Sequence, residues 1–377
     1  MGKELTIMAK KRITEIDIIK GVGILTIAAV HLIYRTESGL ANHIFRALGW
    51  LLIGLFFMLS GYTYSTGKRT VRQSCNARLR YLLFPAAITE IILLIVGGLY
   101  CMLFHGYALS DCLHDALVTF LRPELCVLIS EEWGQGGFLY NNLSPSWFIW
   151  SMLWTELIFI PTAEWCGKGD LKVRGCISAF VLTAVQIPIY MFVSPLPWLL
   201  QLVPLFTVFM LMGMLLHESG LFKCEWRYNA ALTALISFLG FAASVGVFSL
   251  GGDNYFNGYV GVYGNGIDIL LPIIQLVPGI IAFYALAKLI LRVHILSDGI
   301  IWIGRHTLTF LMCHCFFAMI AADMMKTYNR MGEVWYLEDA GLTLTPEIFW
   351  KSVAGYVIAV ICCISVCIAK DTVAKKQ

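Results

Sequence analysis

Hydrophobic residues gather in about ten long runs, which polar segments separate. Each run holds about twenty residues, and a helix of that length spans the roughly 30 Å hydrocarbon core of a bilayer. The pattern predicts an all-α, polytopic membrane protein with about ten transmembrane helices. The expected helices cover residues 18–36, 44–64, 80–103, 146–165, 174–194, 196–216, 230–250, 267–290, 299–321 and 348–369.

Basic residues decide the expected orientation of these helices, because loops on the cytoplasmic side carry an excess of Lys and Arg. With the N-terminus inside, nineteen of the twenty-seven Lys and Arg residues fall on the cytoplasmic side. We therefore expect both termini in the cytoplasm, in a multi-pass protein of the plasma or inner membrane. The expected division is a cytoplasmic segment 1–17, a single transmembrane domain 18–369 and a cytoplasmic tail 370–377. No small-residue cleavage site follows the first run, so we read it as a retained helix and not as a signal peptide.

Composition excludes other classes of protein. Of the 377 residues, 59% are hydrophobic and 14% are charged, which is unlike a soluble globular domain. The net charge of +3 and the lack of a long basic block argue against a nucleic-acid partner. Most of the twelve cysteines, Cys315 among them, fall within hydrophobic runs, where we read them as packing residues, and no spacing indicates a metal site. Three others, Cys101, Cys112 and Cys126, lie in or beside the long segment 104–145 and could form a disulfide bond.

The first hydrophobic run carries three ionisable residues, Asp17, Lys20 and His31. Such residues are costly in a bilayer and usually face a partner, a cavity or a substrate path. Lys20 and His31 are eleven positions apart, so they share one face of a helix, and Asp17 can pair with Lys20 three positions later. Asp17 lies about 21 Å from His31 along the helix, so any partner of His31 comes from another helix. Two acids expected near mid-span, Glu90 and Glu156, are candidates to orient it.

Five short stretches carry a resemblance to a known family. They are Asp17-Ile18-Ile19-Lys20-Gly21 with His31 after it, Phe56-Phe57-Met58-Leu59-Ser60-Gly61-Tyr62, the basic stretch with Arg78 and Arg80 before Pro85, Trp147-Phe148, and Gly304-Arg305-His306-Thr307-Leu308 with His314 after it. With these, the chain resembles the acyltransferase-3 family of integral-membrane O-acyltransferases, in its fucose 4-O-acetylase-like branch. Many members have Arg where this chain has Lys20, which offers a point charge in place of a bidentate contact.

The resemblance implies transfer of an acyl group from cytoplasmic acyl-CoA, with acetyl-CoA as the expected donor, to a sugar hydroxyl at or beyond the membrane. The implied catalytic residues are His31 as general base, with Glu156 and His314, and an acyl-histidine intermediate is a variant of this scheme. The implied donor-binding residues are Lys20, Ser60, Arg78, Arg80 and Arg305, since cationic side chains bind the phosphates of CoA. No tightly bound cofactor or metal is expected, and the expected partners are acyl-CoA, a carbohydrate acceptor and the lipid bilayer.

Each of these residues also has a simpler interpretation. Positive-inside topology alone explains Arg78 and Arg80, close helix packing explains Ser60 with Gly61, and a hydrogen bond to a neighbouring helix explains His314. Arg305 and His314 are nine positions apart, on opposite sides of an ideal helix, so a straight helix leaves Arg305 at the cytoplasmic rim.

Two other functions are compatible with many spans and buried charges. One is a transporter or flippase of a lipid-linked sugar, and the other is a proton-coupled carrier that uses Glu90, Glu156 and His31 as a relay. No internal repeat is evident, which disfavours a transporter. The expected outer loop 251–266 is rich in Tyr and Gly, which suits either stacking on sugar rings or an interfacial aromatic belt.

Overall fold

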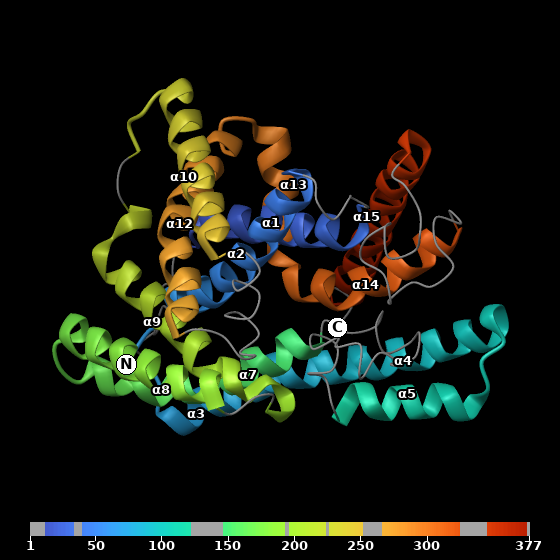
Figure 1. Cartoon of the computed structure of the whole chain (residues 1–377), viewed down its shortest axis with the longest axis horizontal. Coiled ribbons are helices and arrows are strands. Elements are labelled where there is room, and N and C mark those ends of the chain that lie inside the picture. Colours follow the sequence, from blue (N-terminus) through green and yellow to red (C-terminus); the bar gives the residue numbers. More distant parts are fainter. Residues whose placement is uncertain are drawn as a thin grey trace, which may run out of the picture.

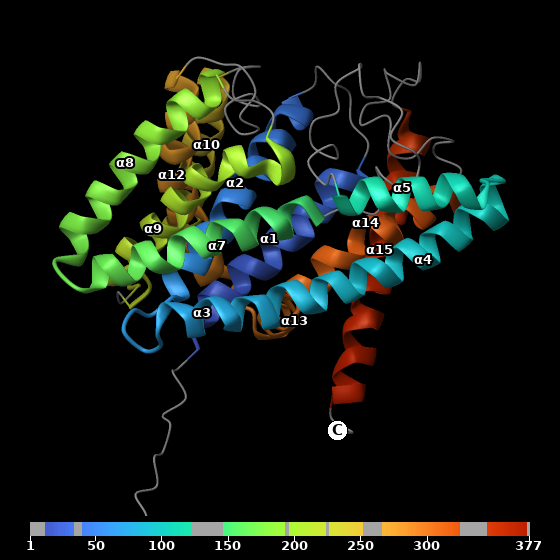
Figure 2. The same ribbon diagram turned by 90° about the horizontal axis from the view of Figure 1, so that it is seen from below.

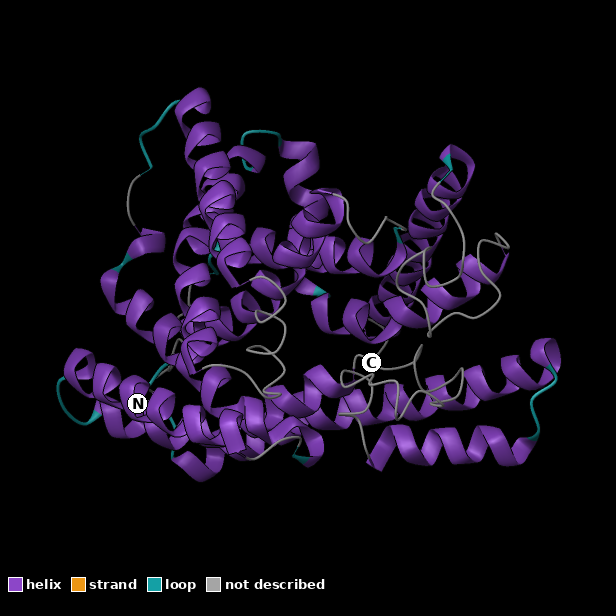
Figure 3. Cartoon of the chain, viewed as in Figure 1, coloured by secondary structure: helices purple, strands orange, loops and turns teal. Residues whose placement is uncertain are grey.

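A computed structural model describes residues 12–33, 40–121, 146–192, 196–223, 226–251, 266–324 and 345–374. All regular structure in these ranges is helical, and none of it is strand (Figure 3). A helix occupies every one of the ten predicted runs. The prediction of an all-α, polytopic fold is therefore confirmed.

The helices follow one another in the order α1 (Thr14–Leu32), α2 (Leu40–Thr63), α3 (Val71–Arg78), the π-helix η1 (Leu79–Leu83), α4 (Phe84–His105), α5 (Leu109–Leu121), α7 (Ser146–Gly167), α8 (Leu171–Phe192), the 3-10 helix η3 (Pro197–Leu202), α9 (Val203–Ser219), η4 (Leu221–Lys223), α10 (Ala230–Gly251), η5 (Gly266–Ile269), α12 (Leu270–Ile290), α13 (His294–Arg305), α14 (Thr307–Met324) and α15 (Pro346–Ala374). The first helix begins and ends four residues earlier than predicted, so His31 lies in its last turn.

Seven helices of the described ranges are long and apolar enough to cross a membrane, and the bent pair α13–α14 makes an eighth. This is fewer than the ten that the hydrophobic runs predict. Helix α1 has a spanning length, but it carries Glu15, Asp17 and Lys20 in its first two turns. The chain is thus a multi-pass membrane protein in which α1 and α7 are the two predicted spans that fall outside this set. Figure 2 shows α3, α13 and the C-terminal end of α15 toward one side of the molecule, and the orientation of both termini stays a prediction.

Helix α1 lies in the middle of the bundle and packs against α2, α12, α13, α14 and α15 (Figure 1). The remaining large contacts pair α10 with α12, α2 with α9, and α14 with α15. At the crossing of α2 and α9 a glycine from each helix meets the backbone of the other. A Cβ on Gly61 would lie 1.9 Å from the carbonyl oxygen of Met210, and one on Gly213 would lie 1.8 Å from that of Met58. Close helix packing therefore accounts for Gly61.

Helices α4 and α5 form an antiparallel hairpin around Gly106, whose φ of 70° is a conformation that glycine adopts without strain (Figures 1 and 2). Part of the predicted outer segment 104–145 is thus helical. Cys101 and Cys112 are both buried, and the Cys112 thiol donates to the carbonyl of Gly98 on α4. A disulfide between these two is not formed, and Cys126 lies outside the described residues.

The predicted continuous helix 299–321 is wrong, because α13 and α14 meet at an angle of 86°. His306 stands at the break with φ −103° and ψ 16°, outside the helical range. Its ring Nδ1 donates to the carbonyl of Trp302 at 2.8 Å, and its Nε2 contacts Asp371 of α15 at 2.9 Å. Arg305 and His314 consequently belong to two differently directed helices, so the geometry of a straight helix does not apply to them.

Candidate active site

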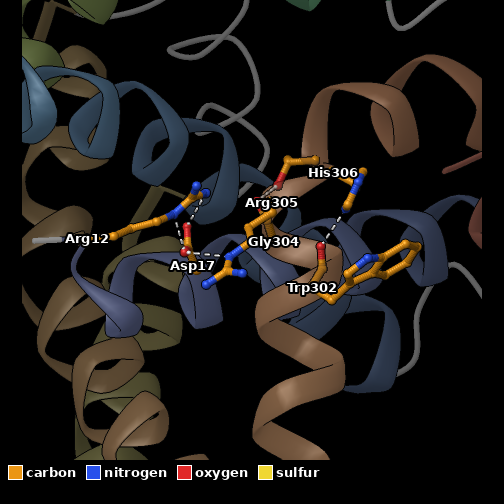
Figure 4. A network of polar contacts seen from close by, with 7 residues as sticks. Arg12, Asp17, Trp302, Gly304, Arg305 and His306 are labelled. Carbon is orange, nitrogen blue, oxygen red and sulfur yellow. Dashed lines mark hydrogen bonds and ion pairs between the residues drawn. The ribbon is translucent and has the colours of Figure 1, made fainter. Parts of the chain in front are cut away.

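A network of ion pairs surrounds Asp17 near the start of α1 (Figure 4). Asp17 is only 3% exposed. The guanidinium of Arg12 donates to both of its oxygens, at 2.6 and 3.0 Å, and Nε of Arg305 lies 3.5 Å from Oδ2. Two arginines far apart in the chain therefore share one buried carboxylate, which lowers the cost of burying its charge.

Two glycines bring α1 and α13 together at this network. A Cβ on Gly304 would lie 1.8 Å from the carbonyl oxygen of Asp17, and one on Gly21 would lie 2.3 Å from that of Ile300. The two backbones are thus in contact, and no larger residue fits at either position without moving a helix. Because Arg305 directly follows Gly304, this contact places its guanidinium beside Asp17.

Lys20 lies one turn further along α1 and is half-buried. The predicted contact between Asp17 and Lys20 is wrong, since the carboxylate pairs with the two arginines instead. Within the described ranges Lys20 makes no hydrogen bond or ion pair, although it lies in electrostatic range of Asp17, Arg12 and Arg78. Among the described residues, no carboxylate contacts its ammonium directly.

A second ion pair joins three helices around Glu156 of α7, which is 2% exposed. The hydroxyl of Ser60 on α2 donates to Oε1 at 2.9 Å, and Nε of Arg78, the last residue of α3, lies 2.5 Å from Oε2. Glu156, a predicted catalytic residue, thus links Ser60 and Arg78, which are predicted to bind the donor. The hypothesis that Glu156 orients His31 is not supported, because its partners in the described ranges are Ser60 and Arg78.

The C-terminal ends of α2 and α7 are held together one turn or two beyond this ion pair. The hydroxyl of Tyr64 donates to Glu164 at 2.8 Å, and the backbone N–H of Gly67 donates to the same carboxylate at 3.0 Å. These bonds keep Ser60 and Glu156 in register across the two helices.

Arg80 is exposed on the π-helix η1, two residues after Arg78. Single π turns within longer helices are frequent at functional sites. Among the residues that the structure describes, Arg80 makes no hydrogen bond or ion pair, and its side chain is exposed.

At the other end of α1, His31 lies against His314 of α14, with 5.4 Å between ring centroids. The prediction that the partner of His31 comes from another helix is confirmed. His314 is 1% exposed, and its Nδ1 donates to the carbonyl of Leu311 at 2.7 Å. The other ring nitrogen, Nε2, is therefore unprotonated in neutral His314 and faces Sγ of Cys315 at 3.3 Å.

The three side chains of His31, His314 and Cys315 form one cluster, here called the imidazole–thiol cluster. Their donor atoms all lie within 4.8 Å of one another. His31 is exposed, Cys315 is half-buried and His314 is buried. Sequence reasoning missed Cys315, which it read as a packing residue, although its position next to His314 was a usable signal.

The second acid expected near His31, Glu90 of α4, is 4% exposed. Its role in orienting His31 stays a prediction. The candidate site therefore has two parts at the two ends of α1: the charge network around Asp17, Lys20 and Glu156 near its start, and the imidazole–thiol cluster at its end. Lys20 and His31 are separated by about 16 Å along the helix axis.

The fold and this site define a multi-pass membrane protein with ion pairs and imidazoles gathered on one central helix. A family model described as an acyltransferase domain matches residues 13–370, from the start of α1 into α15. The chain belongs to this acyltransferase-3 family and is an acyltransferase that transfers groups other than aminoacyl groups. Searches among curated proteins and among solved structures give no significant match. The transporter and carrier alternatives are set aside, and the fucose 4-O-acetylase-like branch stays a prediction.

Proposed function

We propose that this protein moves an acyl group, acetyl in the simplest case, from acyl-CoA to a hydroxyl of a cell-surface or exported glycan. The reaction takes place in the plasma or inner membrane, with the donor entering from the cytoplasm. One observation carries the proposal: α1 aligns a network of cations at its start with two imidazoles at its end. A donor with an anionic head and a reactive thioester at the end of a long arm fits such an arrangement.

Charge supports acyl-CoA as the donor. The network holds four cations and two carboxylates, namely Arg12, Lys20, Arg78 and Arg305 with Asp17 and Glu156. The surplus of positive charge, together with exposed Arg80, suits the phosphates of CoA, which form strong charge-assisted hydrogen bonds with guanidinium and ammonium groups. Phosphates cannot enter the hydrocarbon core, so the head stays at this end while the flexible pantetheine arm carries the thioester toward His31.

His31 is the general base of the proposed reaction. Its exposed ring can take the proton from the acceptor hydroxyl while the oxygen attacks the thioester carbonyl, and the departing CoA thiolate then receives a proton. A positioned base of this kind contributes about 10²–10⁴-fold to the rate. The neighbouring ring of His314 packs against that of His31 and so limits the positions of its side chain.

Aromatic side chains support a carbohydrate as the acceptor. Trp198 packs against Trp150 and Trp154 of α7, with ring centroids 4.8 and 5.6 Å apart. Trp198 and Leu199 have φ values of 61° and 54°, which cost of order 1–3 kcal/mol each, and such strained residues cluster at functional sites. Flat, partly exposed indole faces suit pyranose rings. The tyrosine-rich loop 251–266, for which sugar stacking is one of two interpretations, lies almost wholly outside the described residues.

Mass spectrometry of cell-surface glycans tests the proposal. Cells with the wild-type protein are expected to carry an ester on a glycan hydroxyl, and cells with His31→Ala are expected to lack it. His43→Ala is the matched control, because His43 is a membrane-helix imidazole bonded to Ser249 and stands outside the site. Glycans that are identical with and without the protein would contradict the proposal.

A further inference from the structure

The imidazole–thiol cluster contains a nucleophile that direct transfer does not use. The geometry points to a two-step reaction in which Cys315 takes the acyl group from acyl-CoA, as a thioester, and then passes it to the acceptor hydroxyl. Cys315 is the nucleophile, His314 is its base, and His31 is the base for the second step. This inference rests on the proposed function and adds an intermediate to it.

His314 is built to activate the thiol beside it. Its Nδ1 is occupied by the carbonyl of Leu311, so Nε2 is the nitrogen that can accept a proton, and it stands 3.3 Å from Sγ of Cys315. A nucleophile, a base and a group that orients the base are the three parts of an activated nucleophile. The carbonyl of Leu311 takes the orienting role here.

The three side chains of the cluster differ in solvent exposure, as the proposed two-step reaction requires. His314, 1% exposed, is shielded from water, whereas Cys315 is half-buried and His31 is exposed. The thiol and the second imidazole are therefore the parts that substrates can reach. As the base, His314 has to reach only the thiol of Cys315, so the burial of His314 does not hinder the reaction.

His31 is placed to serve an acyl group on Cys315. Its ring nitrogens and Sγ of Cys315 are within 4.8 Å. A thioester carbon stands next to its sulfur, and an attacking hydroxyl needs hydrogen-bond distance to the base and about 3–3.5 Å to that carbon. A hydroxyl between His31 and an acylated Cys315 meets both conditions.

In the first step His314 takes the thiol proton, and the Cys315 thiolate attacks the carbonyl carbon of acyl-CoA. The bond from that carbon to the CoA sulfur breaks, and the CoA thiolate takes the proton from His314. One thioester replaces another, so no oxidant, reductant or further reactant is needed.

In the second step His31 takes the proton of the acceptor hydroxyl, and the oxygen attacks the acyl carbon on Cys315. The carbon–sulfur bond breaks, and the Cys315 thiolate regains the proton from His31. The product is an ester and the cluster returns to its starting state. Donor and acceptor therefore occupy the site in turn and need not meet.

Isotope exchange in the absence of acceptor tests the intermediate. Purified full-length protein in detergent is mixed with acetyl-CoA and isotopically labelled free CoA. An acyl-enzyme returns its acetyl group to the labelled CoA, so labelled acetyl-CoA is expected to form. Mass spectrometry of the acid-quenched protein is expected to find acetyl on Cys315, and neutral hydroxylamine is expected to remove it, as it does from thioesters.

Three variants separate the steps. Cys315→Ala is expected to lower exchange by about 10³-fold or more, as loss of a nucleophile does. His31→Ala is expected to keep exchange and to accumulate acetyl on Cys315, because only the second step needs this imidazole. The matched control is Cys362→Ala, since Cys362 is another half-buried free thiol, on α15. Thermal unfolding in detergent checks that each variant is folded. If Cys315→Ala is unfolded, Cys315→Ser replaces it, because its side chain is closer in size to that of cysteine.

The outcomes distinguish this inference from the proposed function. A wild-type protein that esterifies glycans but shows neither exchange nor acetyl on Cys315 overturns the thioester step alone. A wild-type protein that neither esterifies glycans nor forms an acyl group on Cys315 overturns both the proposed function and the thioester step. Exchange that persists in folded Cys315→Ala also overturns the step. So does a stoichiometric metal ion that is lost in this variant, because the thiol would then be a ligand.

Discussion

The two ends of α1 differ in how their polar groups are satisfied. At the start, Asp17 and Glu156 are buried within ion pairs that tie together α1, α2, α3, α7 and α13. At the end, the described groups are two imidazoles and a thiol, which come from α1 and α14. In the proposed reaction the charged end binds the donor and the imidazole–thiol end moves protons, so binding and chemistry lie at opposite ends of one helix.

Removing the imidazole of His31 is expected to have the largest effect on the rate of acyl transfer. His31→Ala should lower the rate of glycan acylation by about 10²–10⁴-fold, because the acceptor hydroxyl loses its base. Binding of acyl-CoA should change little, since the charge network is at the other end of the helix. Acylation kinetics and equilibrium binding of acyl-CoA measure the two effects separately. A parallel loss of binding would show that the two ends are not independent.

Widening the contact between α1 and α13 is expected to damage the charge network through the backbone. Gly304→Ala puts a Cβ 1.8 Å from the carbonyl oxygen of Asp17, and overpacking of this kind costs about 1–3 kcal/mol or more. The melting temperature in detergent and the affinity for acyl-CoA should both fall. Gly299→Ala on the same helix is the control, because nothing lies within 4 Å of its Cβ. Equal melting temperatures for the two variants would refute the contact.

Breaking the pair of Arg78 with Glu156 separates binding from stability. Arg78→Ala should raise KM for acyl-CoA by about 10-fold or more, as loss of a charge-assisted hydrogen bond does, and should also destabilise the protein by leaving a buried carboxylate. The double variant Arg78→Met with Glu156→Gln removes both charges and should recover the melting temperature but not the KM. A double variant with normal KM would mean that Arg78 serves only the ion pair.

Changing the charge of Lys20 is expected to give the smallest effect on stability. Lys20→Gln should raise KM for acyl-CoA several-fold, within the 0.5–1.5 kcal/mol range of a single polar contact, and should leave the melting temperature unchanged. Lys20→Arg should preserve or improve binding, because a guanidinium can contact phosphate with two donors. Measurements of KM at several salt concentrations check this, and a fall in melting temperature for Lys20→Gln would indicate a structural role instead.

Several features could be predicted because they depend on neighbouring residues in one segment. The helical class follows from the length of the hydrophobic runs, and the shared face of Lys20 and His31 follows from the helical period. The partner of His31 could be assigned to another helix by distance alone. The helix that supplies this partner could not be predicted, because His314 is remote from His31 in the chain and no helical period relates the two residues.

The sequence by itself determined that this is a helical membrane protein with ionisable groups on its first helix. In a bilayer the backbone N–H and C=O groups have to form hydrogen bonds within the protein, and a long apolar run achieves this as a helix. Only the tertiary structure decided which charges meet. Asp17 pairs with Arg305 and not with Lys20 because glycines let α1 and α13 touch, and Glu156 pairs with Arg78 because α3 crosses α7. The bend at His306 likewise depends on Asp371 of a later helix. Such contacts are set by packing between distant segments, which no spacing within one helix records.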